Sequence, residues 1–199
     1  MSLYKILIFL ITYLICSLNP AIEICKKKTG EDIRKLGSGN AGTANAMRIL
    51  GKPLGMVVVI LDILKVYFSY QIINWIGHTF KMDTEFTLKS IFILATVIGH
   101  CFPVFYGFRG GKGVIVGITT AVILDKKIAL VCIIVGLIVL LVTRIVAMGT
   151  LSGLALYVIM TIVMMPQYIS SIIVISLIVM FKHRNNIQRM IAKQEEKLW

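Results

Sequence analysis

The chain has 199 residues, of which 58% are hydrophobic and only 15% are charged, and its mean hydropathy is +0.90. A soluble domain of this length needs a polar surface that this composition does not supply, so a soluble protein is excluded. The net charge of +12 does not indicate a nucleic-acid-binding protein. The basic residues lie between apolar runs, whereas such a protein carries them on a soluble face with interleaved aromatic side chains.

Apolar segments follow one another along nearly the whole chain. A helix needs about 20 apolar residues to cross about 30 Å of hydrocarbon, so the chain has room for roughly six or seven short crossings. We therefore predict an all-α, polytopic membrane protein with about seven transmembrane helices, forming a single domain over residues 1–199. The apolar segments are 3–22, 53–73, 88–106, 114–124, 128–142, 145–165 and 168–182.

The distribution of Lys and Arg predicts the orientation of the chain. With the N-terminus outside, most of the 21 Lys and Arg residues fall on one face, and the positive-inside rule assigns that face to the cytoplasm. The C-terminus is then cytoplasmic. Lys126 and Lys127 fall on the opposite face, against this rule.

Two charged residues lie inside the second apolar segment. Asp62 and Lys65 are three residues apart, so they share one face of a helix. An unpaired charge in the bilayer costs at least about 2.5–3.5 kcal/mol, so we expect the two side chains to pair or to line a water-filled cavity. A structural ion pair that positions two helices and a direct functional role are both open.

Three polar segments between the apolar runs are rich in glycine, asparagine and basic residues. In the first, residues 36–48, the small residues allow close approach of the backbone, and Ser38, Asn40 and Asn45 offer hydrogen bonds. The planar guanidinium group of Arg48 is suited to a phosphate. A flexible linker is the alternative interpretation.

The second polar segment, residues 99–113, has three glycines around a lysine at its end. We expect these glycines to form a nest of backbone N–H groups, with the ammonium group of Lys112 at its rim, which is an arrangement that binds phosphate. It is not a Walker A loop, because Tyr106 and Gly113 stand where that motif needs Gly and Ser or Thr. A tight interhelical turn is the alternative. The candidate residues are Gly110, Gly111, Lys112 and Gly113.

The third polar segment follows the last apolar run. His183 and Asn186 are three residues apart and point the same way on a continuing helix, and Glu195 comes after them. In the predicted topology all three polar segments face the same side of the membrane. Together they indicate a site for an anionic substrate, most simply one that carries phosphate, at the lipid boundary.

The three segments resemble the motifs of the PlsY family, the acyl-phosphate-dependent glycerol-3-phosphate acyltransferases of bacteria. The matching strings are G-S-G-N-x-G-x-x-N-x-x-R, G-H-x-F-P-x-F-x-x-F-[KR]-G-G-K-G-V and H-R-x-N-I-x-R-x-x-x-x-x-E, in this order, and the resemblance covers nearly the whole chain. It implies transfer of a fatty acyl group from acyl phosphate to the 1-hydroxyl of glycerol 3-phosphate, giving lysophosphatidic acid and phosphate.

The resemblance also implies roles for individual residues. Proton removal from the hydroxyl group falls either to His183 or to a substrate phosphate, and the sequence leaves both open. The residues implied in catalysis are Ser38, Arg48, His183 and Asn186; those implied in substrate binding are Asn40, Asn45, Gly110, Gly111, Lys112 and Gly113; those with a structural role are Glu195, Asp62 and Lys65.

No cofactor and no metal ion is expected for this chemistry. The expected partners are glycerol 3-phosphate, acyl phosphate and membrane lipid, with a functional link to the enzyme that makes acyl phosphate and no interaction with nucleic acid. The expected location is the bacterial cytoplasmic (inner) membrane, as a multi-pass protein.

The chain departs from the family pattern at several positions. Val66 and Lys193 stand where the family usually has glycine, and Ala147 replaces a serine whose hydroxyl is able to contact phosphate. These changes indicate a divergent member of the family. The departing positions are Thr43, Ala44, Val66, Ile115, Val116, Ala147 and Lys193.

Parts of the sequence also fit three other functions. A small transporter of an anionic solute would use Asp62 and Lys65 near the midplane of the membrane. An inactive scaffold descended from the family is a second alternative. An acyltransferase with an H-x-x-x-x-D box is a third, with the spacing present at His78 and Asp83, but the predicted topology places that pair on the outer face.

Overall fold

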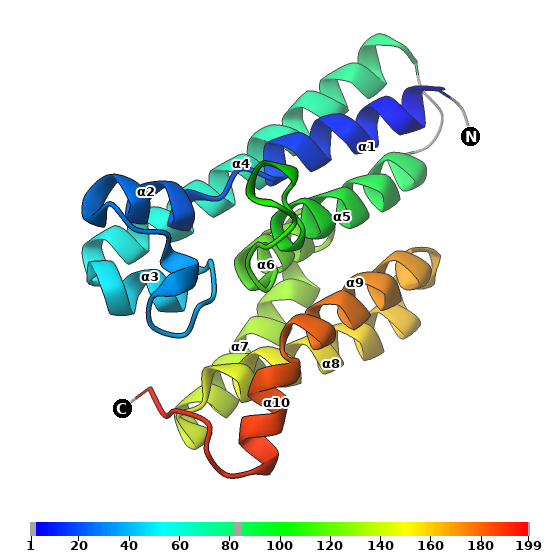
Figure 1. The fold of residues 1–199 in the computed structure, drawn as a ribbon. Coiled ribbons are helices and arrows are strands. Elements are labelled where there is room, and N and C mark those ends of the chain that lie inside the picture. Colours follow the sequence, from blue (N-terminus) through cyan, green and yellow to red (C-terminus); the bar gives the residue numbers. More distant parts are fainter. Residues whose placement is uncertain (1–2, 82–84, 199) are drawn as a thin grey trace. The chain divides into compact units, whose positions relative to one another are not determined.

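The computed structural model describes residues 3–81 and 85–198, and every regular element in these ranges is a helix (Figure 1). This confirms the predicted all-α class. The chain divides into two compact units, Met1–Thr119 and Thr120–Trp199, so the single domain stays a prediction. The helices are α1 (Leu3–Cys16), α2 (Pro20–Thr29), η1 (Ile33–Lys35), α3 (Thr43–Leu50), α4 (Lys52–Thr79), α5 (Glu85–Cys101), η2 (Val104–Tyr106), α6 (Val114–Leu124), α7 (Lys126–Thr143), α8 (Val146–Met164), η3 (Pro166–Tyr168), α9 (Ile169–Lys182) and α10 (Arg184–Ile191).

Five helical segments of the described chain are long and apolar enough to cross a membrane. A sixth candidate span is the bent pair Pro166–Lys182 and Arg184–Ile191, whose two parts differ in direction by 59°. The remaining apolar segment is α6, and its 11 residues rise only about 16 Å, roughly half the thickness of the hydrocarbon. The polytopic membrane class is confirmed, with five or six spans by length and composition. The orientation of the termini stays a prediction.

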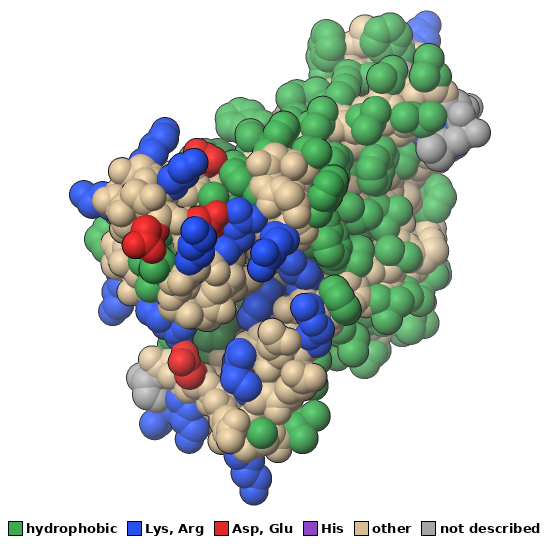
Figure 2. Space-filling view, in the orientation of Figure 1, with side chains coloured by type: hydrophobic (Ala, Val, Ile, Leu, Met, Phe, Trp, Pro, Cys, Tyr) green, Lys and Arg blue, Asp and Glu red, His purple; other side chains and the backbone are tan. Residues whose placement is uncertain are grey.

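Many large apolar side chains of the candidate spans are exposed. In α7 only 17% of the most apolar window is buried, and Leu130, Leu137 and Leu141 are each more than half exposed. Lipid is the solvent that suits such a surface. On the first unit, Figure 2 shows hydrophobic side chains over the end of α1 and α4 that lies away from α2 and α3, and charged side chains over α2 and α3.

The first apolar segment is not one continuous helix, as its prediction over 3–22 implied. The chain leaves α1 after Cys16 and starts α2 at Pro20. Asn19 caps α2, because its Oδ1 accepts a hydrogen bond from the N–H of Ile22 at 3.1 Å. Proline at the first helical position lacks the N–H that a continuing helix needs, so it favours a new helix start there.

Close contacts without side chains between them hold the first unit together. α1 packs against α4 and α5, and a Cβ atom on Gly99 would lie 2.6 Å from the carbonyl oxygen of Tyr13. The hydroxyl group of Tyr13 donates to the carbonyl of Phe102 at 2.8 Å. α3 packs on α4 in the same way, because a Cβ on Gly55 would overlap Met47. These contacts hold α1 against α5 and α3 against α4.

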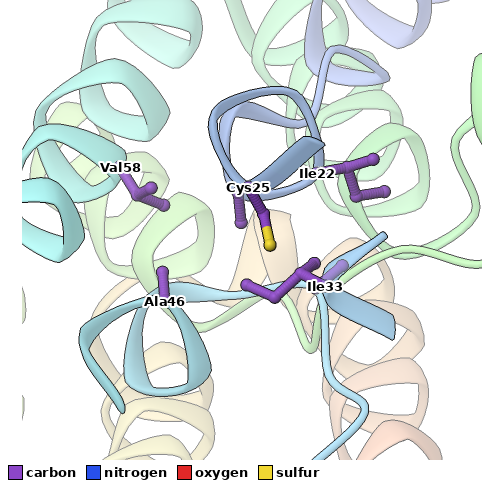
Figure 3. Packing of buried hydrophobic residues seen from close by; sticks show 7 residues of the cluster. Ile22, Cys25, Ile33, Ala46 and Val58 are labelled. Carbon is purple, nitrogen blue, oxygen red and sulfur yellow. The ribbon is translucent and has the colours of Figure 1, made fainter. Parts of the chain in front are cut away.

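A small hydrophobic cluster joins α2, η1, α3 and α4 (Figure 3). Its members are almost completely buried, and Cys25 and Ile33 have no exposed surface. The first polar segment begins directly after η1 and ends within α3, so both of its ends lie beside residues of this cluster. The cluster consists of Ala21, Ile22, Cys25, Ile33, Ala41, Ala46 and Val58.

In the second unit α7 and α8 also approach closely. A Cβ atom on Gly149 would lie 2.9 Å from the Cβ of Leu140, and one on Gly136 would lie 2.9 Å from the carbonyl of Gly149. α9 packs on α8 and ends at Lys182. The chain then bends, and His183 stands between α9 and α10.

Candidate functional site

The first polar segment is organised around the side chain of Asn45. This residue is 1% exposed, and its Nδ2 shares its two hydrogens among three carbonyl oxygens, those of Ile33 at 3.2 Å, Leu36 at 3.0 Å and Asn40 at 3.1 Å. Its Oδ1 accepts the backbone N–H of Ser38 at 3.0 Å. The amide therefore satisfies four backbone groups of one loop, which makes the segment ordered rather than a flexible linker.

Two glycines allow this loop to close. Gly37 and Gly39 have φ angles of 54° and 70°, in the left-handed region that side chains avoid. A Cβ atom on Gly37 would also overlap Oδ1 of Asn45. Around this folded backbone, the side chains of Ser38 and Arg48 are exposed and that of Asn40 is half-buried. The loop presents the first two side chains at its surface and keeps Asn45 inside.

Asn19, at the start of α2, ties this loop to the rest of the first unit. Its Nδ2 donates to the carbonyl of Ala41 at 3.2 Å, while its Oδ1 caps α2. The side chain is 2% exposed. Sequence reasoning did not assign Asn19, although asparagine directly before proline is a recognisable helix-start signal.

In the second polar segment, Gly110 and Gly111 do not form the predicted nest of N–H groups. The N–H groups of Gly110 and Gly111 donate to the carbonyls of Cys101 and His100, each at 3.2 Å. Both N–H groups therefore point back into the protein. Glycine is needed at these positions because a Cβ on Gly110 would overlap the carbonyl of His100, and one on Gly111 would overlap Nε2 of His100. In Gly113, φ is 83°, which again favours glycine.

Arg34 connects the two polar segments of the first unit. Its Nη1 donates to the carbonyls of Tyr106 at 2.6 Å and Arg109 at 3.0 Å, and its Nη2 pairs with Oδ2 of Asp32 at 2.6 Å. The hydroxyl group of Tyr106 donates to Glu23 at 2.8 Å. The hydrogen bond from Arg34 lowers the pKa of Asp32 below its usual value, because it stabilises the carboxylate. These two carbonyl partners of Arg34 lie more than 70 residues away in the chain, so no local sequence pattern predicts them.

Asp62 and Lys65 form the ion pair expected inside the second apolar segment. Nζ of Lys65 lies 2.7 Å from Oδ1 of Asp62, and the two side chains are 6% and 3% exposed. The same Nζ donates to the carbonyl of Leu18 at 2.7 Å and lies 3.1 Å from Nδ1 of His100. An ammonium group only donates, so Nδ1 accepts here, and a neutral imidazole then carries its hydrogen on Nε2. His100, on α5, thus belongs to this polar cluster.

In the second unit His183 is held by the last turn of α9. The side chain is 2% exposed, and Nδ1 lies 2.8 Å from the carbonyl oxygen of Val179. Because a carbonyl oxygen only accepts, Nδ1 carries the hydrogen in this contact. A neutral imidazole then has its lone pair on Nε2, which is the tautomer able to take up a proton at that atom.

The chain after α10 folds back on that helix through Glu195. Its two carboxylate oxygens accept from Nδ2 of Asn186 and, at 2.6 Å, from Nε of Arg189. The N–H of Leu198 donates to the carbonyl of Arg144 at 2.7 Å. The side chain of Asn186 is 7% exposed, and its hydrogen bond to the carboxylate of Glu195 orients its amide group. The resemblance implied a structural role for Glu195, and the structure shows that this carboxylate contacts Asn186 directly.

Two further observations concern other chemistry. Among residues 3–81 and 85–198 there is no group of three or more His, Cys, Asp or Glu side chains arranged to hold a metal ion. Of the H-x-x-x-x-D spacing, His78 lies near the end of α4, and Asp83 lies outside the described residues.

Comparison with known proteins gives one consistent result. A family model described as glycerol-3-phosphate acyltransferase matches residues 6–193. A glycerol-3-phosphate acyltransferase of Thermoanaerobacter sp. (strain X514) is 34% identical over 98% of this chain and 96% of its own length. The one of Francisella tularensis subsp. holarctica (strain OSU18) is 36% identical over 98% of this chain and 92% of its own.

Two solved structures share the fold over nearly the whole chain. A crystal structure of PlsY, an integral membrane glycerol 3-phosphate acyltransferase, in its glycerol 3-phosphate form has a TM-score of 0.86 at 31% identity and covers 98% of this chain and 95% of that one. The lysophosphatidic acid form has a TM-score of 0.83 at 29% identity, with the same coverage. The chain therefore belongs to the glycerol-3-phosphate acyltransferase family of integral membrane proteins.

Proposed function

We propose that this protein transfers a fatty acyl group from acyl phosphate to the 1-hydroxyl of glycerol 3-phosphate, giving lysophosphatidic acid and phosphate. The observation that carries the proposal is the full-length match to a fold solved in both a glycerol 3-phosphate form and a lysophosphatidic acid form. Those ligands are the acceptor and the product of this reaction.

The donor supplies much of the driving force, because acyl phosphate is a mixed anhydride with a good leaving group. The 1-hydroxyl oxygen bonds to the acyl carbon, the bond from that carbon to the phosphate oxygen breaks, and the hydroxyl proton leaves. No enzyme nucleophile is required. Positioning of the two substrates then dominates, and it contributes about 7–11 kcal/mol in favourable cases.

Arg48 and Lys112 are the proposed phosphate ligands of the first unit. A guanidinium group offers a planar fork of donors, and an ammonium group a compact charge, and both suit a phosphate dianion. The exposed side chain of Ser38 lies in the ordered loop before α3, and Arg48 lies in the last turn of α3. For Asn45 we propose a positioning role, because its amide groups are used by the loop backbone.

His183 is the proposed proton acceptor of the second unit, alongside the alternative of a substrate phosphate. The contact of Nδ1 with Val179 leaves Nε2 as the basic nitrogen of the neutral ring. Asn186, oriented by Glu195, is proposed to act in catalysis together with His183. His183→Gln would keep a polar side chain but no base, so we expect a loss of kcat with little change in either KM.

The test is an assay with the purified full chain in detergent, labelled glycerol 3-phosphate and acyl phosphate, run beside acyl-CoA. We expect lysophosphatidic acid and phosphate in equal amounts with acyl phosphate and none with acyl-CoA. Absence of both products would contradict the proposal. Uptake of glycerol 3-phosphate into vesicles without acyl product would favour the transporter instead.

We also propose that the protein lies in the bacterial cytoplasmic membrane with its N-terminus outside, and that it depends on the enzyme that makes acyl phosphate. The distribution of basic residues supports the orientation. Cysteines introduced at Lys28 and Lys81 test it with a membrane-impermeant thiol reagent on intact cells. Labelling at position 81 but not at position 28 is expected, and the reverse pattern would contradict the orientation.

A further inference from the structure

One buried lysine contacts the two segments that lead into the polar loops of the first unit. Nζ of Lys65 donates to the carbonyl of Leu18, between α1 and α2, at 2.7 Å. It also lies 3.1 Å from Nδ1 of His100, near the end of α5, and 2.7 Å from Oδ1 of Asp62 on its own helix. The last of these contacts supplies the compensating charge.

The first contact continues into the loop of residues 36–48. Leu18 precedes Asn19 in the chain, and Nδ2 of Asn19 donates to the carbonyl of Ala41 at 3.2 Å. The carbonyl of Leu18 lies just after the end of α1, where a cation is favoured by the helix dipole. Lys65 therefore fixes the backbone from which Asn19 reaches the loop.

The second contact continues into the loop of residues 103–113. The N–H of Gly111 donates to the carbonyl of His100 at 3.2 Å, and the Cα of Gly111 lies against the imidazole ring. On its other side Gly111 meets the first loop, because a Cβ there would lie 2.8 Å from the carbonyl of Ala41. The contacts therefore close a ring that runs through Lys65, Asn19, Ala41, Gly111 and His100.

We propose that Lys65 is a positioning residue, which sets the spacing between these two loops and thereby the affinity for glycerol 3-phosphate. The choice of glycerol 3-phosphate as the ligand rests on the proposed function, whereas the positioning of the two loops does not. Its ammonium group reaches the carbonyl of Leu18 and Nδ1 of His100 on two other segments, and it forms an ion pair with the carboxylate of Asp62 on its own helix. The planar fork of arginine does not reach three diverging acceptors, so arginine is not expected to replace it.

If Lys65 only held helices together, its loss would loosen α1, α4 and α5. If it positions the loops, its loss should loosen residues 103–113. The test variant is Asp62→Asn with Lys65→Gln, which removes both charges together and so leaves no unpaired buried ion. Lys52→Gln, at the exposed start of the same helix, is the matched control. The amide exchange of residues 103–113 is measured by hydrogen–deuterium exchange, together with KM for each substrate.

We expect the double variant to speed exchange at Gly110 and Gly111 at least about fivefold, with no change within α4. KM for glycerol 3-phosphate should rise at least about fivefold, while KM for acyl phosphate stays within about twofold. Unchanged exchange in the loop, or equal acceleration in α1, α4 and α5, would overturn the proposal.

A second variant covers the case in which the double variant does not fold. Asn19→Ser keeps a cap for α2 but is too short to reach the carbonyl of Ala41. It should produce the same faster exchange at Gly111 and the same rise in KM, and wild-type behaviour would overturn the ring. If the wild-type protein makes no lysophosphatidic acid, the proposed function fails, and the exchange measurement decides the positioning role alone.

Discussion

Lys193 is held in a conformation that suits glycine, and this leads to a quantitative prediction. Its φ angle is 56°, in the left-handed region. The N–H of Lys193 donates to the carbonyl of Met190 at 3.1 Å, and that of Gln194 to the carbonyl of Arg189 at 2.7 Å. These two bonds are the Schellman arrangement, in which glycine is preferred at the position that Lys193 occupies.

The change Lys193→Gly should therefore stabilise the folded end of α10. Left-handed φ costs a residue with a side chain about 1–2 kcal/mol, and the greater freedom of glycine in the unfolded chain offsets about 0.4–1 kcal/mol of the gain. The net gain is about 0.5–1 kcal/mol, which lowers the equilibrium constant for local opening about two- to fivefold. Because Glu195 follows two residues later, its contact with Asn186 should persist longer.

Hydrogen–deuterium exchange of the backbone N–H of Gln194 measures the local opening at the end of α10 directly. Slower exchange by about two- to fivefold is expected in Lys193→Gly. The control is Lys197→Gly, whose position does not have a positive φ angle, and which should leave this amide unchanged or make it exchange faster. Unchanged exchange in Lys193→Gly would refute the argument from backbone strain.

Three further predictions concern the proposed site and its surroundings. Lys112→Ala should raise KM for glycerol 3-phosphate at least about tenfold, since a hydrogen bond to a charged group is worth about 1.5–3 kcal/mol, and steady-state kinetics check this. Glu195→Ala removes both carboxylate oxygens and releases the amide of Asn186, so kcat should fall about tenfold at constant amounts of folded protein. An unchanged kcat would contradict the role of this contact in catalysis. The pKa of Asp32 is lower in the folded protein than its value of 3.8 in the unfolded chain, because Arg34 stabilises the carboxylate. Its stabilising contribution is thus complete above the unfolded pKa and lost as pH falls through the lower folded pKa, so thermal unfolding between about pH 2 and 5 should depend less steeply on pH in Asp32→Asn.

Two kinds of feature were predictable from the sequence: the helices, from long apolar runs, and the contact of two charged residues, from their spacing. Every predicted apolar segment contains a helix, because runs of this length and hydropathy need to satisfy their backbone internally in lipid. The spacing of Asp62 and Lys65 and the cost of an isolated charge predicted either a pair or a water-filled cavity, and the structure shows the pair. The break at residues 17–19 was missed, because an apolar run of sufficient length hides one asparagine and one proline.

The partners of individual polar side chains were not predictable, because they depend on distant contacts. Asn45 was assigned to substrate binding by resemblance, and the structure gives its amide four backbone partners inside its own loop. His100 was not assigned a partner from the sequence, because only the folded chain brings it to Lys65, 35 residues earlier. The assignment of substrate contacts stays a prediction for all of these loops.

The glycines of the second loop show why a motif alone does not determine the chemistry. A string of two glycines, a lysine and a glycine fits a phosphate nest and a closely packed turn equally well, since both need residues without a Cβ atom. The direction of the N–H groups separates the two, and those of Gly110 and Gly111 point to carbonyls of α5. Any phosphate held by this loop then depends on the ammonium group of Lys112 more than on these amides. Loss of that one charge should consequently weaken binding much more than an N–H nest would allow, because a nest would retain most of its donors.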